Sequence, residues 1–283
     1  MCFRAVTSGH RKESQPTTHS QHSFLLAMED YTGSLAQGSV LFSDSVDWEE
    51  HAGPVTVTHV DVATHCAMLR DGSAANKLAA ARAMVILSSE GQGEALGVHG
   101  CRTEIVAAGG HDALLKFLKA DTDGEELSVI LTREAAAAAI CNLCAQDDSR
   151  ALVASGGGIP ILVALCTGWS RGQDLSEELM CYACGALGNL ARDNDVCKSE
   201  IAEAGGIEAL TALARAAGIE DGEGEVPVET TRGEGDDDDT GLELNASIAL
   251  RKLAIGHEAN YAKMRELLSE EDLNYFLHGK MPQ

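Results

Sequence analysis

The stretch Glu104-Ile105-Val106-Ala107-Ala108-Gly109-Gly110 is the best guide to how this chain folds, because close copies of it occur twice more. Its apolar residues recur at a spacing of three to four, which is typical of a helix. The glycine pair supplies a residue that tolerates a positive φ where a helix must turn sharply. Each copy is therefore predicted to be a short helix that ends in a tight corner. The other copies are Ala151-Leu152-Val153-Ala154-Ser155-Gly156-Gly157 and Glu200-Ile201-Ala202-Glu203-Ala204-Gly205-Gly206, so the first glycine of the pair recurs at nearly equal steps.

Two further helical segments follow each corner in a fixed order. A medium segment ends on a leucine whose copies are also spaced almost evenly: Leu69, Leu118, Leu165 and Leu213. A longer, alanine-rich segment ends on a leucine whose copies are spaced unevenly: Leu87, Leu143, Leu190 and Leu253. The uneven spacing indicates that insertions have accumulated in the loop between the second and third segments, whereas the packed units keep their register.

This order of short, medium and long helices resembles the armadillo repeat family. Ala-Gly-Gly stands at the first corner, Asn142-Leu143 and Asn189-Leu190 close the third segments, and the resemblance covers roughly residues 58 to 268. It implies an all-α, right-handed superhelical solenoid of about four three-helix repeats, whose third helices line a concave groove for a partner protein. No unit can bury its apolar face alone, so stacking produces one continuous core.

The remaining segments divide the chain around this repeat domain, which we expect to span residues 58–278. Residues 1–27 are predicted to be a polar disordered tail, with a mitochondrial targeting segment or a start at Met28 as alternatives. Residues 28–57 show no clear period. Glu258 to Leu268 and Ser269 to Leu277 are expected to form a terminal helix pair, with Ser269 and Asp272 as a capping box.

The resemblance also suggests which residues line the groove. Groove-binding members hold the partner's main chain with an asparagine near the end of each third helix and carry a tryptophan four residues earlier. Here the asparagine is present in the two central repeats, but no tryptophan stands at the second position, which argues against a nuclear-transport-type cargo adaptor. An alternative is that the asparagines bond only to neighbouring helix ends. The predicted groove residues are Asn142, Asn189, Tyr182, Arg82, Lys252, Asp193 and Gln146.

The net charge of the chain indicates which classes of partner it can bind. The chain has 21 basic and 44 acidic residues and a net charge of −23, which repels nucleic acids and anionic membranes. The partner is therefore expected to be a protein segment, extended or helical, with basic character. Residues 219–240 form an acidic insertion that includes Asp236, Asp237, Asp238 and Asp239. Such an insertion is either a solvated loop or a flexible attachment point for a basic partner.

The cysteines and the absence of a catalytic motif argue against an enzyme. Nine cysteines, most of them within predicted helices, favour the reducing cytoplasm or nucleus. The pairs Cys141/Cys144 and Cys181/Cys184 have zinc-ligand spacing but stand at different registers of their helices, so we expect buried thiols, with a zinc or redox protein as the less favoured interpretation. No cofactor, metal or catalytic site is expected. No uninterrupted apolar stretch approaches the roughly 20 residues that span a bilayer.

Overall fold

A computed structural model describes residues 62–89, 102–119, 127–168, 175–219 and 241–278. All of these ranges fall within the unit Ser39–Gln283. The expected tail 1–27, the segment 28–57 and the acidic insertion from residue 220 onward lie outside the described residues. Across the described ranges the regular secondary structure is entirely helical, which confirms the predicted fold class.

The helices follow the predicted order of short, medium and long. The first helices are α6 (Arg102–Ala107), α9 (Asp147–Ser155) and α12 (Asp195–Glu203). The second helices are α3 (Val62–Asp71), α7 (Gly110–Lys119), α10 (Gly158–Gly168) and α13 (Gly206–Ile219). The third helices are α4 (Ala74–Ser88), α8 (Leu127–Cys144), α11 (Glu177–Ala191) and α14 (Gly241–Ala254), and the chain continues with α15 (Glu258–Leu267) and α16 (Glu270–His278).

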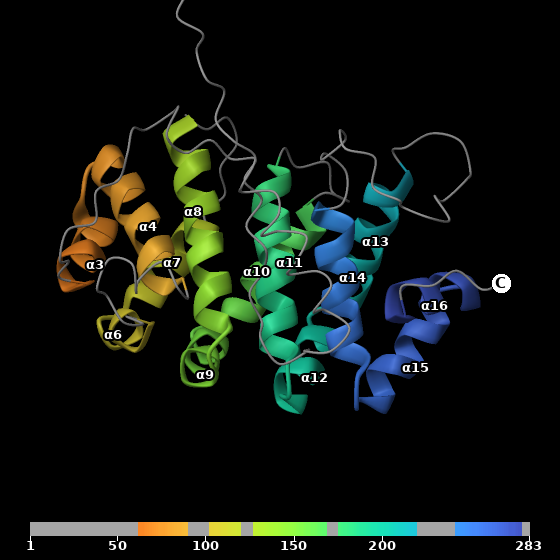
Figure 1. The fold of residues 1–283 in the computed structure, drawn as a ribbon. Helices are drawn as coiled ribbons and strands as arrows, with labels where there is room; N and C mark the ends of the chain where they lie inside the picture. Colours follow the sequence, from red (N-terminus) through yellow and green to blue (C-terminus); the bar gives the residue numbers. More distant parts are fainter. Residues whose placement is uncertain (1–61, 90–101, 120–126, 169–174, 220–240, 279–283) are drawn as a thin grey trace, which may run out of the picture. The chain divides into compact units, whose positions relative to one another are not determined.

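The repeats are stacked so that equivalent helices become neighbours (Figure 1). Helix α8 packs between α4 and α11, and α11 packs between α8 and α14, so the third helices form one layer. The second helices α3, α7, α10 and α13 contact one another in the same sequence and form the layer behind it. The core lies between the layers, and it includes every predicted leucine anchor, such as Leu143 and Leu190 at 0 % exposure.

Small side chains let the third helices approach closely. The run Ala135 to Ala139 in α8 is buried. A Cβ atom at Gly188 of α11 would lie 3.3 Å from the Cα of Ala249 in α14, so a larger residue there would require α14 to shift slightly. Helix α8 is long and apolar enough to cross a membrane by length and composition, and so is the bent pair α9 and α10. However, 67 % of α8 is buried within the helix stack, as is typical of a core helix.

The corners between first and second helices recur at a constant spacing along the chain. The corner glycines with positive φ are Gly109 (69°), Gly157 (79°) and Gly205 (86°). The middle corner therefore uses Gly157 and Gly158, one residue later than the pair Gly156 and Gly157 expected from the repeated stretch. The following glycine leaves no space for a side chain, since a Cβ atom at Gly206 would lie 2.5 Å from Cγ2 of Ile201.

A second feature with the same period was missed from the sequence. Arg102, Arg150 and Lys198 occupy one equivalent position of the first helices, spaced as evenly as the corner glycines, and all three are buried. Arg102 Nε donates to the carbonyl oxygen of Ser88 at the end of α4 (2.5 Å). Lys198 Nζ donates to that of Ile255 just after α14 (2.7 Å). Each cation therefore satisfies carbonyl groups that a helix end leaves without partners.

Arg150 makes the largest set of such contacts. Its Nε donates to the carbonyl oxygen of Cys144, the last residue of α8 (3.2 Å), and its Nη1 donates to that of Arg192, just after α11 (2.5 Å). Arg192 in turn donates from Nη2 to the carbonyl oxygen of Ala145. The ends of two successive third helices are thus joined by side-chain hydrogen bonds.

The terminal helix pair was predicted correctly. Helices α15 and α16 contact α13 and α14 at the end of the stack. The expected capping interaction is present, because the Oγ of Ser269 accepts a hydrogen bond from the backbone nitrogen of Asp272 (3.1 Å).

We predict that Leu190→Ala lowers the free energy of unfolding by about 2–5 kcal/mol, because it leaves a cavity between the layers. Leu152→Ala provides a matched control, since Leu152 of α9 is 44 % exposed. Chemical denaturation followed by circular dichroism measures both variants. Equal losses for the two leucines would contradict the assignment of Leu190 to the core.

Candidate functional site

The candidate site is the third-helix face, which we define as the surface of α4, α8, α11 and α14 turned away from the second helices (Figure 1). Five of the predicted groove residues are carried by these helices, and Gln146 and Asp193 follow directly after α8 and α11. The structure brings some of them into contact with each other, whereas others lie apart.

Asn189 is the centre of a hydrogen-bond chain across three third helices. Its side chain is 1 % exposed. Its Nδ2 donates to the carbonyl oxygen of Cys141 on α8 (3.2 Å), and its Oδ1 accepts from Nζ of Lys252 on α14 (3.2 Å). The amide therefore joins neighbouring repeats, which is the alternative role considered from the sequence.

Asn142 occupies the corresponding place one repeat earlier. Its Nδ2 lies 3.2 Å from the Oγ of Ser88, 3.3 Å from the Oγ of Ser89 and 3.4 Å from the carbonyl oxygen of Val85, all at the end of α4. The side chain is only half-buried. The donors of both asparagines thus point to the preceding third helix.

Lys252 carries its ammonium group in an unfavourable environment. The pKa of Lys252 is lowered from its usual 10.5 to about 8, mainly by burial; Cys141 opposes this shift, and the charges of Arg192 and Arg150 act in the same direction as burial. The hydrogen bond to Asn189 supplies one acceptor for the group. In the repeat pattern, Lys252 occupies the position at which the resemblance to groove-binding armadillo repeats implies a third asparagine.

The other predicted groove residues lie within the third helices, as Arg82 and Tyr182 do, or just after their ends, as Gln146 and Asp193 do. Arg82 of α4 and Tyr182 of α11 are buried, at 8 % and 4 % exposure. Burial raises the pKa of Tyr182, and nearby Cys141, Cys181 and Glu134 add to this effect. Gln146 and Asp193 are exposed, and Asp193 has a φ of 52°, a left-handed conformation that is uncommon for a residue other than glycine.

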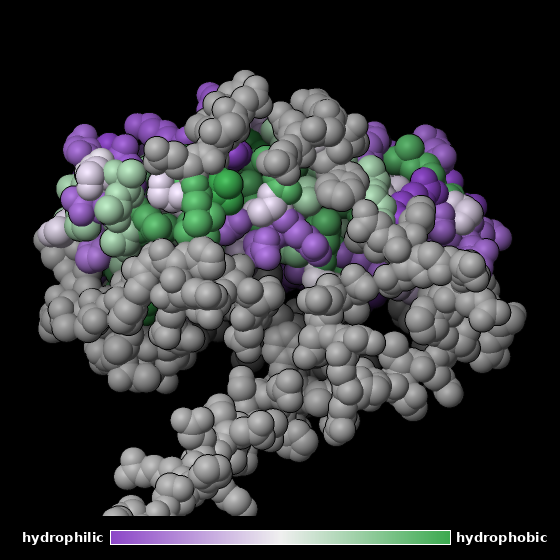
Figure 2. All heavy atoms as spheres, turned by 90° about the horizontal axis from the view of Figure 1, so that it is seen from above, coloured by the Kyte–Doolittle hydropathy of each residue, from purple (hydrophilic) through white to green (hydrophobic). Residues whose placement is uncertain are grey.

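Carboxylates gather near the start of α11, which sequence analysis did not single out. Glu134 of α8 is buried, and this burial raises its pKa; a hydrogen bond from Ser176 opposes the shift and the charge of Glu178 adds to it. Glu177 and Glu178 occupy the first turn of α11, and Glu177 is exposed. Figure 2, which views the molecule from this side, shows hydrophilic and hydrophobic side chains next to one another. Leu127, the first residue of α8, is 52 % exposed.

The cysteines lie within helices and are mostly buried. Cys184 has Cys166 of α10 as a neighbour, with their Sγ atoms 3.8 Å apart. Burial raises the pKa of Cys141 to about 12 and that of Cys181 to about 12. Thiols of this kind stay protonated near neutral pH, and the thiolate is the form that attacks substrates and binds metals. Within the described ranges, no three His, Cys, Asp or Glu side chains come together in a way that could hold a metal ion.

Comparison with known proteins identifies the fold. No protein-family model and no curated protein matches the sequence. Among solved structures, a designed armadillo repeat protein aligns with 73 % of this chain and 70 % of its own, at 22 % identity and a TM-score of 0.54. The chain has the armadillo fold.

Two further designed armadillo repeat proteins match this solenoid. One, solved in complex with the peptide (KR)4, has a TM-score of 0.53 and 20 % identity over 73 % of this chain and 70 % of its own. The other, described as designed for modular peptide recognition, has a TM-score of 0.51 and 22 % identity over 76 % and 79 % of the two chains. The armadillo-type solenoid implied by the resemblance is thereby confirmed.

We predict that Asn189→Ala lowers the free energy of unfolding by about 1–3 kcal/mol, because it leaves buried polar partners on α8 and α14 unsatisfied. Asn274→Ala is the control: Asn274 lies on α16, the last helix, and is exposed. Denaturant titration compares the two. A loss as small for Asn189→Ala as for Asn274→Ala would show that the inter-repeat bonds contribute little.

We also predict a pH dependence caused by Lys252. The unfolded chain binds a proton at Lys252 up to its usual pKa of 10.5, whereas the folded state releases it near 8, so stability rises with pH between these values. Lys252→Met removes this rise. The unfolding free energy of the original protein, relative to the variant, should therefore increase by about 2 kcal/mol from pH 8 to 10.5. A constant difference across that range would contradict the lowered pKa.

Proposed function

We propose that the protein is a binding scaffold whose third-helix face holds a segment of a partner protein. The observation that carries this proposal is the continuous layer of α4, α8, α11 and α14, which presents a surface four helices wide built on a rigid core. The fold is shared with designed proteins described as made for peptide recognition, which supports the same interpretation.

The charge of the face indicates the chemistry of the partner. Glu177 and Glu178 stand at the start of α11, with Glu134 nearby, in a chain whose net charge is −23. A basic segment gains Coulomb attraction from such a surface, and the attraction also accelerates encounter. The likeness to a designed armadillo protein solved with (KR)4 points to the same class of ligand.

In this proposal Asn142 and Asn189 have a structural role. Because the side-chain donors of Asn142 and Asn189 bond to neighbouring helices, they fix the spacing between repeats. The contacts that select a partner then come from side chains whose polar groups lie at the surface, above all the carboxylates of α11. We propose no catalytic role, since raised thiol pKa values make the cysteines of α8 and α11 poor nucleophiles.

We predict that a fluorescent (Lys-Arg)4 peptide binds the protein and that Glu177→Gln with Glu178→Gln weakens binding. Removing two carboxylates from the contact surface should raise Kd by about 5- to 10-fold at low salt, and the effect should shrink as salt increases. Fluorescence anisotropy at several salt concentrations measures both.

The matched control is Glu200→Gln with Glu203→Gln, which changes the net charge equally on exposed residues of α12, outside the third-helix face. An equal loss of affinity for both double variants would mean that the peptide senses only overall charge, and the proposed face would be wrong. Deletion of residues 220–239 tests the acidic insertion separately. It should slow association and flatten the salt dependence while the Glu177/Glu178 effect persists.

A further inference from the structure

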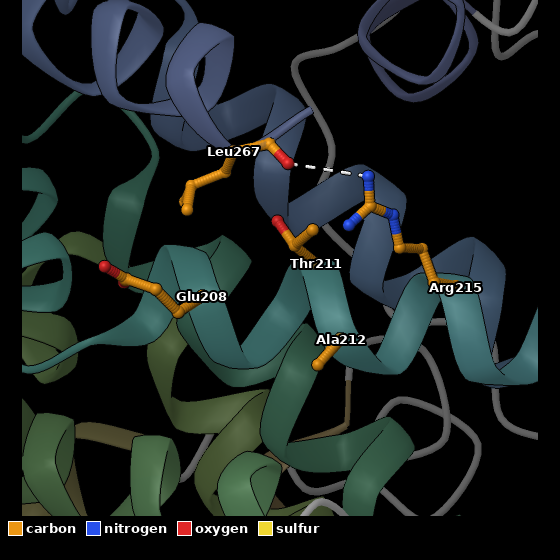
Figure 3. A pocket seen from close by; sticks show the side chains of 5 residues that line it. All are labelled: Glu208, Thr211, Ala212, Arg215 and Leu267. Carbon is orange, nitrogen blue, oxygen red and sulfur yellow. Dashed lines mark hydrogen bonds between the residues drawn. The ribbon is translucent and has the colours of Figure 1, made fainter. Parts of the chain in front are cut away.

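A small cavity lies on the opposite side of the unit, between α13 of the second-helix layer and the terminal pair α15 and α16 (Figure 3). Its volume is about 150 Å³. Four of its lining residues stand on one face of α13, and one ends α15: Glu208, Thr211, Ala212, Arg215 and Leu267.

The cavity exists because the terminal corner differs from the others. In two earlier repeats the second glycine of the corner packs onto the preceding second helix: a Cβ atom at Gly110 would lie 3.1 Å from Sγ of Cys66, and one at Gly206 would lie 3.3 Å from Cγ2 of Val163. The corner between α15 and α16 has Leu268 and Ser269 instead of a glycine pair. The surface of α13 is therefore not covered as closely as those of α3 and α10.

Thr211 carries an unsatisfied hydroxyl group at this place. Its side chain is 5 % exposed, and its Oγ1 has no hydrogen-bond partner. A buried hydroxyl without a partner is unfavourable, and valine would fill nearly the same volume without this cost. The polar atom beside a cavity therefore points to a ligand that supplies the missing bond.

Arg215 presents a second donor to the same cavity. Its Nη2 donates to Oδ2 of Asp272 (2.8 Å) and lies 3.5 Å from the carbonyl oxygen of Leu267. Figure 3 shows its other terminal nitrogen directed toward Thr211. The hydrogen bond to Arg215 holds the pKa of Asp272 below its usual value, so this carboxylate is charged at neutral pH and keeps the guanidinium in place.

The charges around the cavity cancel. Arg215 pairs with Asp272, and Glu208 pairs with Lys263, whose Nζ lies 2.7 Å from Glu208 Oε1 and also donates to the carbonyl oxygen of Ala202 (3.0 Å). An anionic ligand would be repelled by two carboxylates, and a cationic ligand would be repelled by Arg215 and Lys263. A neutral polar group fits this surface better than either.

We propose that the cavity binds a neutral carboxamide, the side chain of a glutamine or asparagine in a protein segment. Its carbonyl oxygen accepts hydrogen bonds from Arg215 and Thr211, and its amide nitrogen donates to Glu208. Ala212 and Leu267 contact the aliphatic part. The Thr211 hydroxyl is buried, so binding requires a lining side chain such as Leu267, which is 37 % exposed, to turn aside.

The test uses N-acetylglutamine methylamide as the probe and ¹H–¹⁵N NMR of the full chain as the measurement. The probe should shift the amide signals of Thr211, Ala212 and Arg215 in a saturable manner. Thr211→Val should raise Kd by about 5-fold, as expected for one lost hydrogen bond, without lowering the melting temperature. Thr167→Val on α10 is the matched control and should leave the Kd unchanged.

Two related probes test the assigned chemistry. N-acetylleucine methylamide lacks the polar group and N-acetylglutamate methylamide carries a charge, so both should bind more weakly than the glutamine probe. Equal or tighter binding of either one, absence of shifts with the glutamine probe, or an unchanged Kd in Thr211→Val would overturn the proposal. Binding of (Lys-Arg)4 should be the same in Thr211→Val and the original protein, so the outcome is independent of the third-helix face.

Discussion

The structure depends on the absence of a Cβ atom at the second glycine of each corner. At Gly110, Gly158 and Gly206 such an atom would lie 2.5–2.8 Å from the side chain of the residue five positions earlier, which is closer than real contacts allow. The first and second helices can therefore cross tightly. This crossing fixes where the second helix starts, and with it the layer on which the third helices rest.

Most of the architecture was readable from the sequence because these constraints are local. The leucine anchors, two of the three glycine corners and the terminal helix pair fall where the sequence pattern placed them. The middle corner was misplaced by one residue, since Ser155-Gly156-Gly157-Gly158 offers two possible pairs and only the backbone angles distinguish them.

The buried cations Arg102, Arg150 and Lys198 could have been found, because they recur with the period of the corner glycines, three positions before Ile105, Val153 and Ile201. The contacts of these cations with helix ends could not have been predicted from the sequence, because the contacts join residues as far as 57 positions apart.

The candidate site was less predictable for the same reason. Sequence spacing placed Asn142 and Asn189 on equivalent turns, but it did not reveal which atoms their amides would contact. The outcome depends on the neighbouring helix: α14 offers Lys252, whose ammonium group needs an acceptor in a partly buried place, and Asn189 supplies it. The carboxylates at the start of α11 depend in turn on how α8 and α11 are staggered, which brings Glu134 and Glu178 near each other.

The two carbonyl groups held by Arg150 also have a consequence for how the chain unfolds. A solenoid behaves approximately as a linear array in which each repeat is stabilised by its own fold and by the interface with its neighbours. Because one guanidinium bonds to the ends of both α8 and α11, separating these repeats disrupts the termini of two helices at once. The coupling energy between the central units is thereby increased relative to their intrinsic stability. We therefore expect the central repeats to unfold together and partial unfolding to begin at the ends of the array.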